Sequence, residues 1–151
     1  MARMHSRKRG KSKSKRPYRQ NIPEWVEMDK EEIQETVINL SKKGESASKI
    51  GVVLRDQYGI PSTKLMTQKR ISKILDDNNM SPDLPEDLMN LISTSVELDR
   101  HRTNNPKDMT AKRGMQLVNS KINRLAKYYI REGRIPSDWK YNLESAKLLV
   151  R

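Results

Sequence analysis

Apolar residues in the first half of the chain recur at helical spacing and predict three short helices with tight turns. The first begins at Asp29, a plausible N-cap with Glu32 three positions later, and ends at Gly44. The inner faces of the three helices are expected to carry Ile33, Val37 and Leu40; Ala47, Ile50, Gly51, Leu54 and Tyr58; and Ile71, Ile74 and Leu75.

Polar and helix-breaking residues set the ends of the second and third helices. Ser46 can cap the second helix, and Gly59 followed by Pro61 ends it. The third helix is expected from about Thr67 to Asn78, with its basic residues facing outward.

The helical pattern resumes after the segment SPDLPED, whose two prolines mark a boundary. Leu88, Leu91, Ile92 and Leu98 then predict a helix that runs to about Thr103 and is broken by Asn-Asn-Pro.

The strongest helix signal starts near Asp108 or Thr110 and ends at Gly133. Its apolar stripe consists of Met115, Val118, Ile122, Leu125, Ala126 and Tyr129. IPSDWKY then predicts a turn with an aromatic anchor, and residues 143–150 a short final helix. Since no alternating strand pattern appears, the predicted fold class is all-α.

These elements predict a basic tail over residues 1–20, an N-terminal helical extension domain over 21–80 and a C-terminal domain over 81–151. The extension is expected to be a three-helix, helix-turn-helix-like unit, and the C-terminal domain an antiparallel helical bundle. The tail is expected to be disordered alone, because it has almost no aliphatic residues to bury.

The charge is divided unevenly along the chain, which has 31 basic and 19 acidic residues and a net charge of +12. Residues 1–20 and 91–151 are strongly basic, whereas the middle of the chain is acidic. Two basic regions indicate two surfaces for a polyanion. We expect phosphate contacts, weakened by salt, from the tail residues Arg3, Arg7, Lys8, Arg9, Lys11, Lys13, Lys15, Arg16 and Arg19.

The composition argues against several classes of protein. The longest aliphatic run has three residues, and no apolar segment resembles a secretory signal, so we expect a cytoplasmic protein with no membrane contact. With no cysteine, and with His5 and His101 far apart, neither a metal nor another cofactor is expected. Phosphate-loop, dinucleotide and nucleophile-elbow motifs are absent, so we expect no enzyme and no small-molecule substrate.

One face of the long helix is both basic and aromatic. At about 100° per residue, its members fall in a sector of roughly 80° away from the apolar stripe. Arginine can grip phosphate with two hydrogen bonds and tyrosine can stack on a base, which favours RNA over an ordinary solvated face. The members are Arg113, Lys121, Arg124, Tyr128 and Arg131.

The loop before this helix, HRTNNPKDMTAKRG, brings polar side chains together around a proline turn. Asp108 and Thr110 could simply cap the helix. Alternatively, Asp108 could accept hydrogen bonds from guanine amino groups in an RNA minor groove.

The segment HRTNNPKDMTAKRGMQLVNSKINRLAKYYIREGRIPSDWKY resembles the C-terminal part of the small-subunit ribosomal protein family numbered fifteen, in its archaeal form. PYRQNIPEW, KKGESASKIGVVLRDQYGI and SPDLPEDL resemble the N-terminal extension of archaeal and eukaryotic members. The resemblance implies a helical, non-catalytic protein of the ribosome. It would bind the central domain of small-subunit ribosomal RNA at a three-way junction, early in assembly, beside neighbouring ribosomal proteins and with the large subunit as a further partner.

The resemblance also implies roles for single residues. His101 and Asp108, with Arg113 and Gly114, match the family's minor-groove site. Arg124 and Tyr128 match its junction contacts, and these two were already selected by helical geometry.

The sequence departs from the bacterial members of the family in two places. The bacterial loop has a serine where this chain has Ala111, with Thr110 beside it. The bacterial contacts that open the first bundle helix have no clear counterpart around residues 80–87.

An alternative reading of the N-terminal region is a helix-turn-helix DNA-binding protein, with residues 67–75 as the recognition helix. Against it, residues 21–90 contain nine basic and thirteen acidic residues, whereas a DNA reader should concentrate positive charge on that helix.

Overall fold

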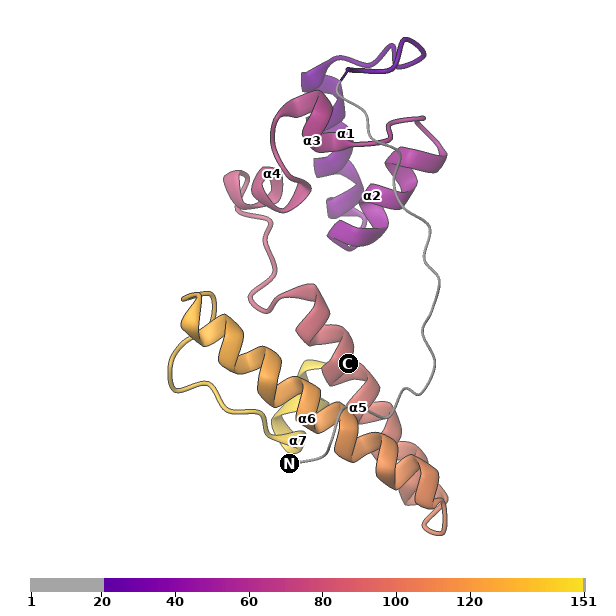
Figure 1. Ribbon diagram of the computed structural model, residues 1–151, viewed down its shortest axis with the longest axis vertical. Helices are drawn as coiled ribbons and strands as arrows, with labels where there is room; N and C mark the ends of the chain where they lie inside the picture. The colour runs from indigo at the N-terminus through magenta and orange to yellow at the C-terminus, as the bar shows by residue number, and fades with distance from the viewer. Residues whose placement is uncertain (1–20, 151) are drawn as a thin grey trace. The chain divides into compact units, whose positions relative to one another are not determined.

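The structure, a computed structural model, describes residues 21–150. Every regular element in that range is a helix, so the all-α prediction is confirmed (Figure 1). The described chain divides into two compact units, residues 21–83 and 84–150. None of the described helices is long and apolar enough to cross a membrane.

The N-terminal unit opens with α1 (Lys30–Lys42) and α2 (Ala47–Asp56). The cap predicted for α1 is confirmed, because the Asp29 backbone N–H donates to the Glu32 carboxylate at 3.2 Å. The Ser46 hydroxyl accepts a first-turn backbone N–H of α2 at 3.3 Å, as predicted. Both caps satisfy backbone donors that a helix start leaves unpaired.

The prediction that the third helix is a single element starting at about Thr67 is wrong. The structure has two short helices, α3 (Thr63–Thr67) and α4 (Ile71–Asp77). Gln68 lies between them in the left-handed region, with φ of 59°, where a right-handed helix cannot continue. The Thr67 hydroxyl accepts the Lys69 backbone N–H at 3.3 Å and so helps to close the turn.

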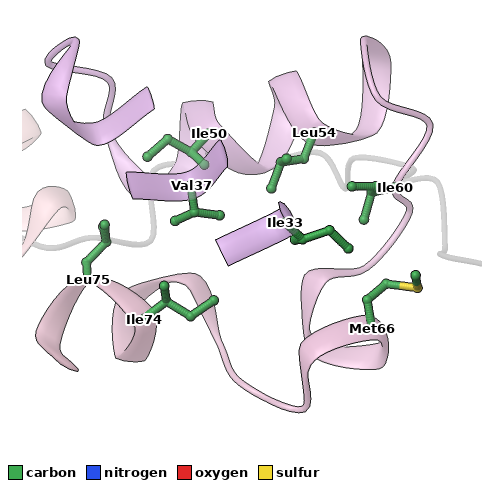
Figure 2. Packing of buried hydrophobic residues seen from close by; sticks show 8 residues of the cluster. All are labelled: Ile33, Val37, Ile50, Leu54, Ile60, Met66, Ile74 and Leu75. Carbon is green, nitrogen blue, oxygen red and sulfur yellow. The ribbon is translucent and has the colours of Figure 1, made fainter. Parts of the chain in front are cut away.

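Figure 2 shows the core of this unit, to which the helices and the loop after α2 contribute. Tyr58 was placed on the inner face of the second helix and is instead 42% exposed, because α2 ends at Asp56. The glycine predicted on that face, Gly51, lies at a close approach: an added Cβ would be 3.4 Å from Ile71 Cδ1. The buried core residues are Ile33, Val37, Ile50, Leu54, Ile60, Met66, Ile74 and Leu75.

The C-terminal unit is built on an antiparallel pair of long helices, α5 (Glu86–Asn104) and α6 (Met109–Arg131), followed by α7 (Leu143–Leu149) (Figure 1). Both α6 and α7 agree with the predicted elements within a residue or two. The apolar faces of the three helices and the loop after α6 form a second core. Its buried members are Leu88, Ile92, Ile122, Ile135 and Ala146.

A polar cluster also lies within this second unit. Ser95 is completely buried on α5, and its hydroxyl lies 2.7 Å from the Tyr141 hydroxyl and 3.1 Å from Asn119 Oδ1 of α6. These bonds join three segments of the unit and compensate the cost of burying a hydroxyl.

Candidate nucleic-acid interface

The predicted face of α6 is exposed along its whole length. The opposite side of the helix is anchored in the core, where Ile122 is fully buried. This anchoring fixes the rotation of α6 and turns the predicted face toward solvent. The exposed predicted residues are Arg113, Lys121, Arg124, Tyr128 and Arg131.

Tyr128 is held in place by its neighbours although its side chain is 45% exposed. Its ring meets the Tyr129 ring edge to face, with centroids 5.1 Å apart and planes at 60°. The Arg131 guanidinium carbon lies 6.0 Å from the Tyr128 ring centroid, within the range of a cation–π contact. A positioned, partly exposed aromatic ring is a suitable platform for stacking.

Three residues of this helix were not among the predicted site residues. Leu117 is partly exposed and projects between Arg124 and Tyr128 at 100° per residue, which the same projection would have shown. Lys127 is exposed beside the sector. Gln116 accepts a hydrogen bond from the Arg113 guanidinium at 3.2 Å, a contact that no pattern in the sequence predicted.

The loop between α5 and α6 brings together His101 and Asp108, whose Nε2 and Oδ2 atoms are 2.9 Å apart. The Asn105 side-chain amide donates to the His101 carbonyl at 3.1 Å and lies 3.4 Å from His101 Nδ1. With the Asn105 amide beside Nδ1, the Nε2 atom of His101 is the one that can donate to the Asp108 carboxylate. The two predicted loop residues therefore form one connected group.

Asp108 is also the N-cap of α6, and its Oδ1 accepts the Ala111 backbone N–H at 2.9 Å. That hydrogen bond, followed by the one from His101, holds the pKa of the Asp108 carboxyl below its usual range. The carboxylate is thus ionised at neutral pH and retains lone pairs for further donors. It borders an open hollow of about 470 Å³ that His101 and residues 104–107 also line. The neighbouring Thr110 is exposed.

Gly114 lies on α6 at a position where no neighbouring element of the described chain packs closely enough to exclude a side chain. A Cβ added there would meet no heavy atom within 4 Å beyond the local backbone of α6. Glycine inside a helix is unfavourable relative to alanine by about 1 kcal/mol. The open space over its Cα is therefore a place where a partner's backbone can approach α6 closely.

The basic tail and the question of a metal site are separate from the α6 face and its loop. The nine basic tail residues lie outside the described part of the chain. Within residues 21–150, no group of three or more histidine, cysteine or acidic residues is placed to hold a metal ion.

Comparison with known proteins gives a consistent result over the whole chain. Residues 1–60 match the Ribosomal S13/S15 N-terminal domain, and residues 67–149 match the family Ribosomal protein S15. Proteins named small ribosomal subunit protein uS15 are 46% identical in Methanospirillum hungatei, 47% in Methanoculleus marisnigri and 45% in Methanococcus vannielii. Each alignment covers 150 residues and 99% of both chains. The chain therefore belongs to the S15 family of small-subunit ribosomal proteins, uS15.

Proposed function

We propose that this protein is a structural constituent of the small ribosomal subunit that binds the central domain of small-subunit ribosomal RNA at a three-way junction. It supports assembly of that domain and catalyses no reaction. The observation that carries the proposal is the pairing of Arg124 and Tyr128, one turn apart on an exposed face of α6 that contains no acidic residue. Family membership supports the same conclusion.

At the junction, the α6 face would bind by two kinds of contact. Arg124 and Arg131 can each donate two hydrogen bonds to a phosphate, with a geometry that lysine does not offer. Tyr128, positioned by Tyr129 and Arg131, can stack on a base that the junction leaves unpaired. Lys121 adds positive charge at the edge of the face.

The loop would read a neighbouring minor groove. The ionised Asp108 can accept hydrogen bonds from guanine amino groups while His101 holds it in place. Arg113 can neutralise a phosphate beside it, and the open space at Gly114 lets the RNA backbone approach. Thr110 is exposed at the same end of α6 and can contribute its hydroxyl.

The remaining parts of the proposal concern location and partners. In the ribosome the protein would contact neighbouring ribosomal proteins and the large subunit, and its basic tail would thread between RNA segments. The helix-turn-helix alternative is weakened, because the recognition helix it needs is interrupted at Gln68.

The test is RNA binding by the double variant Arg124→Ala/Tyr128→Ala, compared with Arg55→Ala/Tyr58→Ala. The control removes the same residue types from exposed positions of the N-terminal unit. Affinity for a central-domain junction RNA should fall by about 3 kcal/mol in the first variant, through loss of a charged contact and a stacking platform, and stay unchanged in the control. Duplex DNA and an unrelated RNA of equal length, at two salt concentrations, measure specificity. Wild-type affinity in the first variant would exclude the α6 face as the RNA-binding surface.

A further inference from the structure

A second candidate site lies on the N-terminal unit and shares no residue with the α6 face or with the loop before α6. An open hollow of about 360 Å³ is bounded by the first turn of α2, the loop that leads into α3, and the start of α4. Ile60, labelled in Figure 2, and Gly51 contribute to its apolar part. The polar residues around it are Ser48, Ser62, Thr63, Lys64, Arg70 and Ser72.

The charge around the hollow is opposite to that of the unit that contains it. Residues 21–83 include nine basic and eleven acidic residues, so the unit as a whole is slightly negative. The residues that line the hollow include two basic residues, Lys64 and Arg70, and no acidic residue. A local positive surface on an otherwise acidic unit indicates an anionic partner.

No side chain of residues 21–150 engages the two cations of the hollow. Three other basic residues of the unit form ion pairs: Lys49 with Glu45, Arg55 with Asp56, and Lys69 with Asp77. Within the described chain, neither Lys64 nor Arg70 forms an ion pair or a side-chain hydrogen bond, and both are exposed. Their donors are thus available to an external anion.

The shape and composition of the hollow indicate which anion fits. It is widely open, whereas a pocket for a small molecule encloses most of its ligand. None of the residues that line it is aromatic, so it offers no surface for stacking a base. Cations and hydroxyls around an open hollow suit the phosphate of a polymer that continues on both sides.

We propose that this hollow binds a backbone phosphate of ribosomal RNA through Lys64 and Arg70, assisted by the hydroxyls of Ser62 and Ser72. The inference rests on the proposed function, but it assigns a second contact that is separate from the α6 face. Since only backbone groups are recognised, the contact adds affinity and orients the N-terminal unit without reading sequence.

The test uses the full-length protein and full-length small-subunit ribosomal RNA, with binding measured across a range of salt concentrations. Lys64→Gln/Arg70→Gln should bind more weakly, and the slope of log affinity against log salt should shrink by about 0.7 to 0.9, the value for one neutralised phosphate. Lys64→Arg/Arg70→Lys should keep the wild-type slope. Lys30→Gln/Lys43→Gln, which removes the same charge from exposed positions at the start of α1 and just after its end, should also keep it.

Other results would overturn the proposal in distinguishable ways. A wild-type slope in Lys64→Gln/Arg70→Gln, while Arg124→Ala/Tyr128→Ala loses affinity, would exclude the hollow and leave the proposed function intact. An equal decrease of the slope in Lys30→Gln/Lys43→Gln would show that the effect reflects the net charge of the protein and not a site at the hollow. Binding to anionic phosphatidylserine vesicles that depends on Lys64 and Arg70, with unchanged RNA binding, would assign the hollow to lipid instead. Wild-type affinity in Arg124→Ala/Tyr128→Ala would contradict the proposed function itself.

Discussion

Tyr128 and Tyr129 are consecutive residues of α6 whose rings meet edge to face, with centroids 5.1 Å apart, although one ring faces solvent and the other faces the core. Tyr129 packs against the core, and its hydroxyl bonds to Asp87 near the start of α5. Tyr128 is nearly half exposed. The inner ring is thus fixed by the fold and in turn positions the outer ring, which we propose to contact RNA.

The first prediction concerns the inner tyrosine. Its hydroxyl donates to both carboxylate oxygens of Asp87, at 2.8 and 2.7 Å. Tyr129→Phe removes this charge-assisted bond, so the free energy of unfolding should fall by about 1.5–3 kcal/mol. Urea denaturation measures the change, and Tyr58→Phe, at an exposed position, is the control. A Tyr129→Phe variant as stable as the wild type would show that the bond makes no net contribution.

The same tyrosine predicts a pH dependence. Burial, with help from the Asp87 bond, raises the pKa of Tyr129 from 10.0 to about 12. Because the folded-state pKa is raised, the stabilising contribution is complete below pH 10 and is lost as the pH rises through 12. The free energy of unfolding should therefore decrease more steeply from pH 10 to 12 in the wild type than in Tyr129→Phe. Parallel curves for the two proteins would contradict this prediction.

A further prediction concerns the buried hydroxyl of Ser95, which is bonded to Tyr141 and Asn119. Ser95→Ala leaves those two partly buried polar groups without this partner. The expected loss of stability is about 1–3 kcal/mol, measured as a lower midpoint in urea. Ser145→Ala, exposed on α7, should change stability by less than about 0.5 kcal/mol. A similar small effect at Ser95 would mean that neighbouring groups or water replace its bonds.

The helices and the α6 face could be predicted from the sequence, because both depend on periodicity within one segment. The apolar stripe of α6 fixes which side is buried, and the opposite side follows at 100° per residue. Ser46 and Asp108 could likewise be recognised as caps, because capping is a local property.

The features that could not be predicted depend on contacts between distant residues or on unusual backbone. Ser95 has no apolar signal, and its partner Tyr141 lies 46 residues further along the chain. The break before α4 occurs at Gln68, a residue type that rarely adopts positive φ and gives no sign of a turn. The hollow at Lys64 and Arg70 is likewise visible only once α2, α3 and α4 have packed.

Removal of residues 1–20 gives the next prediction. The tail carries nine basic residues and almost no aliphatic ones, so it should contribute to RNA affinity and not to the core. The truncated protein should keep its helical circular dichroism and thermal transition, while its RNA affinity should depend less steeply on salt. A truncated protein that unfolds would show that the tail belongs to the fold.

The last prediction separates stability from binding at Gly114. An alanine Cβ there meets nothing within 4 Å beyond the local backbone of α6, so Gly114→Ala should raise the free energy of unfolding by about 0.5–1 kcal/mol. If the RNA backbone approaches this point as proposed, the added methyl group should weaken RNA binding by about 1–3 kcal/mol, the usual cost of overfilling a packed contact. Asn123→Ala is the control, because Asn123 is exposed on the side of α6 opposite to Gly114. This variant should raise stability without weakening binding. A Gly114→Ala protein that is more stable and binds RNA as tightly as the wild type would remove the close approach from the proposed interface.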